Sequence, residues 1–162
     1  MHFEEFGRSF SHRIFTTRFT FVFFLLNTPA EVFPGQSEVI GSPQPIVAVV
    51  GDDVILPCRL EPQLNVEDLT VEWTRRDLRA EYVHLHRDGR EMLAMKNPLY
   101  SGRTALSRDG LKHGDISLKI TNVTLADGGK YRCFLPKLNS RKKESIVQLV
   151  VLGESSGGFI CL

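Results

Sequence analysis

Between residues 46 and 152, hydrophobic and polar residues alternate in short runs that are separated by turn signals. The runs that predict strands are residues 46–50, 54–60, 69–73, 82–86, 116–120, 130–134 and 146–152. Asp88-Gly89, the favoured pair of a two-residue hairpin, comes shortly after the run at residues 82–86 and predicts a hairpin there. A period of two with frequent turns predicts an all-β sandwich or barrel, and residues 37–152 form one domain in this interpretation.

The first thirty residues have a different pattern. Arg8, Arg13 and Arg18 precede an apolar block at residues 19–26, and small residues come after this block. This order is typical of a secretory signal peptide, and the block is shorter than the roughly 20 residues that cross a bilayer. We expect residues 1–30 to be a signal peptide that is cleaved between positions 30 and 35. A buried N-terminal helix is the alternative.

Composition and charge narrow the possible functions. The 162 residues are 42% hydrophobic and 24% charged, with a formal net charge of +1, which disfavours a nucleic-acid binder that relies on positive charge. The sequence lacks an evident Ser/His/Asp constellation, glycine-rich phosphate loop or metal-ligand cluster. We therefore expect no enzyme, no cofactor and no metal. Secretory routing places the three cysteines in an oxidising compartment, where a well-placed pair forms a disulfide.

The residues around two of the cysteines resemble an immunoglobulin variable-type domain. Trp73 lies between Cys58 and Cys133, and Asp127-Gly128-Gly129-Lys130-Tyr131-Arg132-Cys133 has the pattern D-x-G-x-Y-x-C. Residues 36–41, 45–58, 83–89 and 100–104 look like butyrophilin and myelin oligodendrocyte glycoprotein. The resemblance covers about residues 37–152. It implies two antiparallel sheets with Greek-key connections.

The resemblance also implies structural roles. Cys58 and Cys133 would form a disulfide between the sheets, which the loop-entropy model values at about 4–5 kcal/mol; metal ligation or nucleophilic chemistry by these cysteines is the alternative. Further structural residues are Trp73, Arg103, Asp127, Gly129 and Tyr131. Trp73 would pack beside the bridge, Tyr131 would hydrogen-bond across a corner, and Arg103 would pair with Asp127.

A partner is expected on one face of one sheet. If Val83 and Leu85 face inward, period two points a set of eight side chains outward: Glu72, Thr74, Tyr82, His84, His86, Lys130, Arg132 and Phe134. Aromatic residues among basic ones are typical of protein-recognition surfaces, and the family uses this sheet for receptor and dimer contacts. A solvated face with incidental aromatics is the alternative. The basic loop, residues 135–144, either steers an acidic partner or is a solvated tip.

Three smaller features have local interpretations. Asn122-Val123-Thr124 is an N-glycosylation acceptor sequence, and we expect a glycan on Asn122 rather than an unmodified turn asparagine. His84 and His86 share a strand face, but no third zinc ligand is evident nearby. Cys161 is left over, either as a free thiol or as the partner in an intermolecular disulfide.

The resemblance predicts the extracellular recognition domain of a butyrophilin-like protein, which binds a cell-surface receptor on T cells and regulates T-cell activation. The alternative is a homophilic adhesion module, like myelin protein zero, that forms homodimers. Residues 153–162 form a tail without a spanning helix, so membrane contact is expected only through a segment outside this chain. The domain is then either displayed outside the plasma membrane or secreted. An antigen-receptor domain is disfavoured because residues 136–152 lack F-G-x-G.

Overall fold

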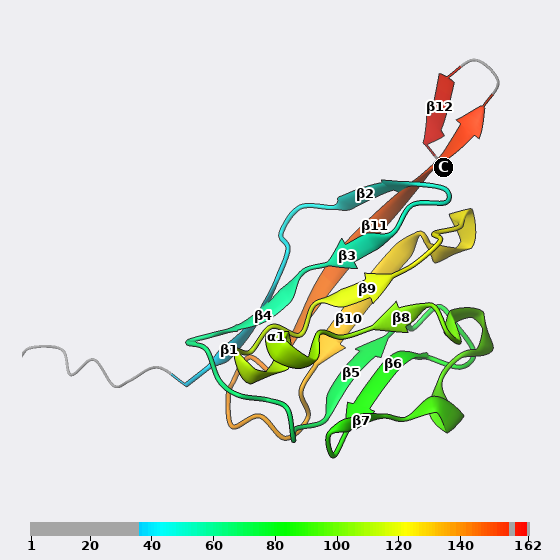
Figure 1. Cartoon of the computed structure of the whole chain (residues 1–162). Coiled ribbons are helices and arrows are strands. Elements are labelled where there is room, and N and C mark those ends of the chain that lie inside the picture. The colour runs from blue at the N-terminus through cyan, green and yellow to red at the C-terminus, as the bar shows by residue number, and fades with distance from the viewer. Residues whose placement is uncertain (1–35, 156–157, 162) are drawn as a thin grey trace, which may run out of the picture. The chain divides into compact units, whose positions relative to one another are not determined.

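The computed structural model describes residues 36–155 and 158–161, so the expected signal peptide lies outside the described residues. The described chain forms two β-layers (Figure 1). The all-β prediction is confirmed, because helices in this part of the chain are limited to single short turns. None of these helices has the length and apolar character that a membrane span requires.

The first layer, called here the front sheet, is a seven-stranded sheet in the order β12-β11-β10-β5-β6-β7, with β2 added beside β11. Its strands are β2 (Ile46–Val49), β5 (Val71–Thr74), β6 (Tyr82–Arg87), β7 (Arg90–Glu91), β10 (Gly129–Phe134), β11 (Glu144–Ser155) and β12 (Gly158–Cys161). β2 runs parallel to β11, and the other pairs are antiparallel. Part of the expected tail therefore continues β11 and pairs with β12.

The second layer, the back sheet, contains the order β3-β9-β8 and, beside it, the pair β1-β4. Its strands are β1 (Glu38–Gly41), β3 (Val54–Leu56), β4 (Cys58–Glu61), β8 (Thr104–Ala105) and β9 (Leu118–Ile120). Pro57 divides the single strand predicted at residues 54–60, since proline has no backbone N–H for the ladder. Earlier in the chain, the connection from β1 to β2 passes from the back sheet to the front sheet. Pro43 and Pro45 lie in this connection.

Turns connect these strands. The helical turns are η1 (Leu93–Met95), η2 (Pro98–Tyr100), α1 (Arg108–Lys112) and η3 (Leu125–Asp127). The predicted hairpin at Asp88-Gly89 joins β6 to β7, and both residues have positive φ, 51° and 73°. Two consecutive positive φ values define the type I′ turn, whose twist matches that of the paired strands.

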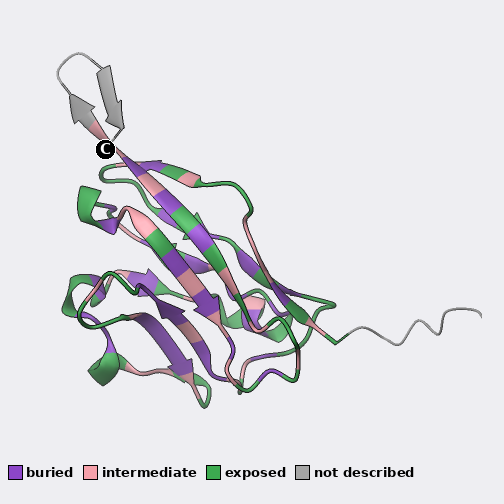
Figure 2. Ribbon diagram, turned by 180° about the vertical axis from the view of Figure 1, so that it is seen from behind, coloured by how far each residue is buried: buried purple, intermediate pink, exposed green. Residues whose placement is uncertain are grey.

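The core lies between the layers and is crossed by a disulfide. Buried and exposed residues alternate along the strands (Figure 2). Cys58 on β4 and Cys133 on β10 are bonded, with their Cα atoms 6.7 Å apart. Trp73 is fully buried, and its Nε1 donates to the Ile116 carbonyl at 2.9 Å. These contacts fix the spacing of the two layers.

A polar cluster closes the end of the domain where η3 leads into β10. The Tyr131 hydroxyl donates to the Asp127 carbonyl at 2.6 Å, which forms the corner expected from the sequence. The Asp127 carboxylate accepts from Arg103 Nη2 at 2.5 Å and from the Thr124 backbone N–H at 2.7 Å. Asp127 is 2% exposed, so both contacts compensate the burial of its charge.

Arg75, which the sequence did not single out, lies at the centre of this end. Its guanidinium donates to the Tyr100 hydroxyl and the Ala126 carbonyl, both at 2.8 Å, and to the Gly128 carbonyl at 3.0 Å. Burial would lower the pKa of Arg75, but hydrogen bonds to Asp77 and Tyr100 outweigh it and raise the pKa above its ordinary value. A Cβ on Gly129 would approach Arg75 Nη2 to 2.8 Å, so this position needs glycine.

Candidate functional site

The outer face of the front sheet, which points away from the core, is the candidate recognition surface. In the ladders, Arg132 pairs with Thr74 and Ile146, and Phe134 pairs with Glu72 and Glu144. Cross-strand partners share a face of a sheet. The outer face therefore comprises Glu72, Thr74, Tyr82, Lys130, Arg132, Phe134, Glu144, Ile146 and Gln148.

The predicted outward orientation of His84 and His86 is wrong. His84 pairs with Trp73 and His86 with Val71, so both imidazoles share the core-facing side, and they are only 3% and 7% exposed. Leu85, expected to face inward, instead pairs with Glu72 of the outer face. The register of β5 and β6 shifts between Trp73 and Thr74, which indicates a β-bulge, and one extra residue reverses the alternation beyond it.

Thr74 is also less accessible than expected. It lies on the outer face opposite Tyr82 and Arg132, but it is only 5% exposed. Of the buried side-chain oxygens and nitrogens in the described part of the chain, only Thr74 Oγ1 has no hydrogen-bond partner. An unpaired buried hydroxyl costs about 1–3 kcal/mol of stability.

A hollow of about 760 Å³ opens beside Thr74 on the outer face. It is lined by Thr74, Arg76, Asp77, Lys130, Arg132, Glu144 and Ile146. Arg132 is paired with Glu144, and Asp77 with Arg75. Arg76 and Lys130 are exposed and belong to none of the ion pairs formed among the described residues. The hollow therefore presents two cations without an ion-pair partner, Arg76 and Lys130, to an approaching molecule.

An aromatic and an aliphatic side chain lie beside the hollow. The Arg132 guanidinium carbon lies 4.0 Å from the centre of the Phe134 ring, and Arg132 Nε donates to Glu144. This distance is that of a cation–π contact between the guanidinium and the ring. Ile146 is 50% exposed on the neighbouring strand. The outer face thus combines an aromatic residue with arginine, two residue types that are enriched in protein interfaces.

Sequence reasoning missed the contribution of β11 to this surface. Glu144, Ile146 and Gln148 face outward, whereas Val147 and Leu149 are buried. The signal that identifies this contribution is the alternation of polar or exposed residues with buried ones along residues 144–149.

The basic loop, residues 135–144, is anchored rather than extended. Leu138 is 4% exposed, and its backbone N–H donates to the Leu135 carbonyl at 3.2 Å. The Leu135 N–H donates to the Lys143 carbonyl at 3.0 Å, which closes the loop base. Lys137 and Arg141 are exposed on it. The loop thus holds positive charge at the end of β10 next to the outer face.

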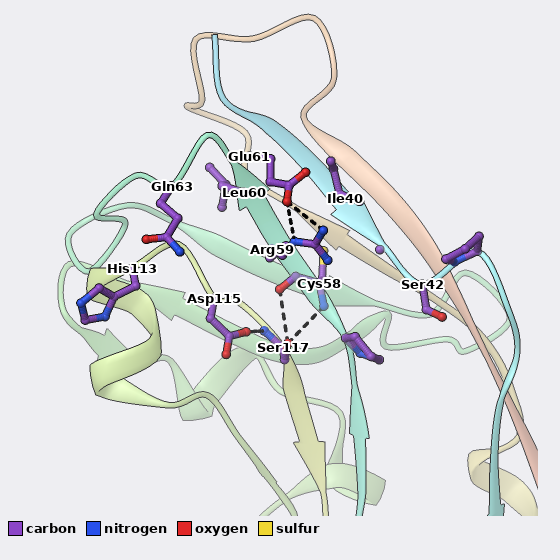
Figure 3. A pocket seen from close by; sticks show the side chains of 13 residues that line it. Ile40, Ser42, Cys58, Arg59, Leu60, Glu61, Gln63, His113, Asp115 and Ser117 are labelled. Carbon is purple, nitrogen blue, oxygen red and sulfur yellow. Dashed lines mark hydrogen bonds and ion pairs between the residues drawn. The ribbon is translucent and has the colours of Figure 1, made fainter. Parts of the chain in front are cut away.

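A second hollow, of about 480 Å³, lies on the back sheet beside β1, β4 and the segment after α1 (Figure 3). Several of its polar groups are paired with one another. Arg59 Nη2 donates to Glu61 Oε1 at 2.8 Å, and the Ser117 N–H donates to Asp115 Oδ1 at 3.0 Å. This internal pairing makes it a weaker candidate than the front-sheet hollow.

The buried histidine at the edge of the front sheet gives the domain a pH-dependent stability. His84 Nδ1 lies 3.0 Å from Thr104 Oγ1 and 3.4 Å from Glu91 Oε1. Burial lowers the pKa of His84 from its ordinary 6.5 to about 4; Glu91 opposes this shift, and Lys96 and His86 add to it. Between these values the unfolded chain binds a proton that the folded chain does not, so stability falls as the pH falls.

We expect the free energy of unfolding to drop by about 2 kcal/mol between pH 7 and pH 5 through this histidine. The His84→Gln variant should lose that part of the pH dependence, because its amide does not titrate. Urea denaturation at several pH values measures the difference. The control is His113→Gln, since His113 is exposed. An unchanged pH profile in His84→Gln would contradict the assignment.

Comparison with known proteins places this geometry in context. Residues 41–152 match the family model of the immunoglobulin V-set domain. The chain is 42% identical over 125 residues to butyrophilin subfamily 1 member A1 of Homo sapiens, covering 77% of this chain and 23% of the relative. It is 39% identical over 132 residues to myelin-oligodendrocyte glycoprotein of Macaca fascicularis, covering 82% of this chain and 53% of the relative.

A solved structure shows the same similarity in three dimensions. The crystal structure of bovine butyrophilin superposes with a TM-score of 0.67 at 37% identity, covering 74% of this chain and 56% of that chain. In the sequence comparisons, the chain spans about a quarter of the length of the human butyrophilin and about half the length of the macaque myelin-oligodendrocyte glycoprotein.

Proposed function

We propose, from the premise that this chain belongs to the immunoglobulin V-set family, that its domain binds a cell-surface protein through the outer face of the front sheet. The domain is of the butyrophilin and myelin oligodendrocyte glycoprotein type, and such domains are extracellular recognition modules. The partner in this proposal is a receptor on T cells. Binding regulates T-cell activation and immune signalling.

One observation carries the proposal: the outer face has a hollow whose lining includes the unpaired cations Arg76 and Lys130 and the exposed Ile146, and Thr74 in its wall has a buried hydroxyl without a hydrogen-bond partner. Isolated exposed apolar residues are common, but a buried polar group without a partner is rare in folded proteins. A partner that places an acidic group in the hollow pairs with Lys130 or Arg76. Phe134 and Ile146 then supply the desolvated contact area.

The charges on this face favour a partner with an acidic surface. Lys130 and Arg76 line the hollow. The basic loop adds Lys137 and Arg141 at the end of β10, which is the other end of the outer face. Such a distribution speeds encounter with an acidic partner and makes the association rate fall with added salt.

The test is staining of T cells with a multimer of the domain. We expect Phe134→Ala with Ile146→Ala to weaken staining at least tenfold, since two central contacts are lost. The matched control is Ile55→Ala on the back sheet, where Ile55 is 59% exposed, against 50% for Ile146. Equal staining by the front-sheet variant and the control would remove this face from consideration.

The same variants test the homophilic alternative. Sedimentation of the domain at micromolar concentration reports self-association. If the domain self-associates, and the front-sheet variant abolishes self-association while T cells show no staining, the module is adhesive and the receptor proposal is wrong.

A further inference from the structure

The turn between β9 and β10 presents an asparagine whose backbone is fixed and whose side chain is exposed. Asn122 has φ of 50°. Its backbone N–H donates to Asp53 Oδ1 at 3.1 Å, and its carbonyl accepts from Arg103 Nη2 at 3.0 Å. Asparagine adopts positive φ more readily than most residues. The backbone contacts thus hold the side chain outward at a defined position.

The next two residues hold this turn in place. Val123 is fully buried, and its N–H and carbonyl bond to the Asp52 carbonyl and the Gly51 N–H, at 2.8 and 2.7 Å. The Thr124 hydroxyl donates to Asp127 Oδ2 at 3.2 Å and caps η3. The Asn-Val-Thr acceptor sequence therefore forms a surface turn with a buried centre, and its asparagine stays accessible after folding.

Exposed apolar side chains flank the turn. Val50 precedes Gly51 in the segment that bonds to Val123, and it is 42% exposed. Leu125 comes directly after Thr124 and is 46% exposed. Leu125 belongs to η3, which directly precedes β10, and the Val50 N–H donates to the Leu152 carbonyl of β11. The basic loop lies at the opposite end of β10 (Figure 1). A bulky hydrophilic group at Asn122 would cover this apolar end.

We propose that Asn122 carries an N-linked oligosaccharide that shields the apolar end formed by Val50 and Leu125. In the transfer step, Asn122 Nδ2 forms a bond to the anomeric carbon of N-acetylglucosamine on a lipid-linked pyrophosphate oligosaccharide. The bond from that carbon to the pyrophosphate breaks, the lipid pyrophosphate leaves with the electron pair, and the amide loses one proton. The structure constrains where the glycan starts.

The glycan starts on the back-sheet side of the domain. The backbone of Asn122 is held by Asp53, which precedes β3, and by Arg103, which precedes β8. The outer face of the front sheet therefore stays open to a partner. The glycan goes beyond the recognition function and does not depend on it, since it requires only passage through the secretory pathway.

The experiment expresses the full chain in secreting mammalian cells and treats the medium with peptide N-glycosidase F. We expect a mobility shift on treatment, and peptide mapping should show Asn122 converted to aspartate. Asn122→Asp should remove the shift, and because aspartate also tolerates positive φ it should fold normally. Thr124→Ser is the matched control, since serine keeps both the acceptor sequence and the capping hydroxyl.

Shielding of the apolar end by the glycan is measured in a separate experiment. Binding of a dye that fluoresces on apolar surface should increase in Asn122→Asp and stay at the wild-type level in Thr124→Ser. Secreted protein with an intact disulfide and unmodified Asn122 would overturn the proposal. Glycosylated protein whose dye binding is unchanged by Asn122→Asp would overturn the shielding.

Discussion

Replacing Arg75 with alanine is expected to lower the free energy of unfolding by about 3–5 kcal/mol, because buried acceptors lose their donor and a cavity remains. The Tyr100 hydroxyl and the carbonyls of Ala126 and Gly128 all accept hydrogen bonds from this guanidinium. The Arg75 side chain is only 4% exposed, so water does not replace these bonds without local opening. Urea denaturation at neutral pH measures the loss.

Two further variants sharpen this prediction. Arg75→Lys should recover little stability, because a single ammonium cannot reach acceptors on several sides as the planar guanidinium does. Arg79→Ala is the control, since Arg79 is exposed in the same loop, and it should change stability by less than about 0.5 kcal/mol. Equal losses in Arg75→Ala and Arg79→Ala would contradict the central role of Arg75.

Removing the disulfide with Cys58→Ala and Cys133→Ala is expected to cost about 2–5 kcal/mol. The bond closes a loop with a sequence separation of 75, and in the chain-entropy model its main effect is to restrict the unfolded chain. Trp73, the single tryptophan, pairs with Cys133 across β5 and β10, so its fluorescence reports the unfolding transition.

The two losses should differ in kind. Without the disulfide, exchange should increase in the slowest amides of the core, which exchange through global unfolding, and should stay close to the wild type where exchange occurs by local opening. In Arg75→Ala, exchange should increase around η3 and the start of β10, whose carbonyls lose their donor. A variant that lacks the disulfide and keeps wild-type stability would show that the core alone holds the layers together.

The local pattern was enough for much of this domain. Alternation in β3, β4, β9 and β10 predicted which side chains enter the core, because successive side chains of a strand point to opposite faces. Asp88-Gly89 predicted the hairpin because both positions need positive φ. The resemblance around Cys58, Trp73 and Cys133 then supplied the fold.

The same rule failed where a distant strand determined the register. The bulge between Trp73 and Thr74 depends on the pairing of β5 with β6. The alternation of residues along β6 alone does not reveal it. His84 and His86 therefore enter the core, and the surface expected from them is smaller than predicted. Ile146 and Glu144 of β11 enlarge it on the other side.

By itself the sequence determined the strand pattern, the disulfide-bonded family and the acceptor sequence at Asn122, because each is encoded by neighbours in the chain or by a recognisable motif. Only the tertiary structure decided that Arg75 bonds to Tyr100 and Gly128, that the Thr74 hydroxyl lacks a partner, and which residues share the outer face of the front sheet. These properties arise from contacts between segments far apart in the chain. Their register is set by packing rather than by local periodicity.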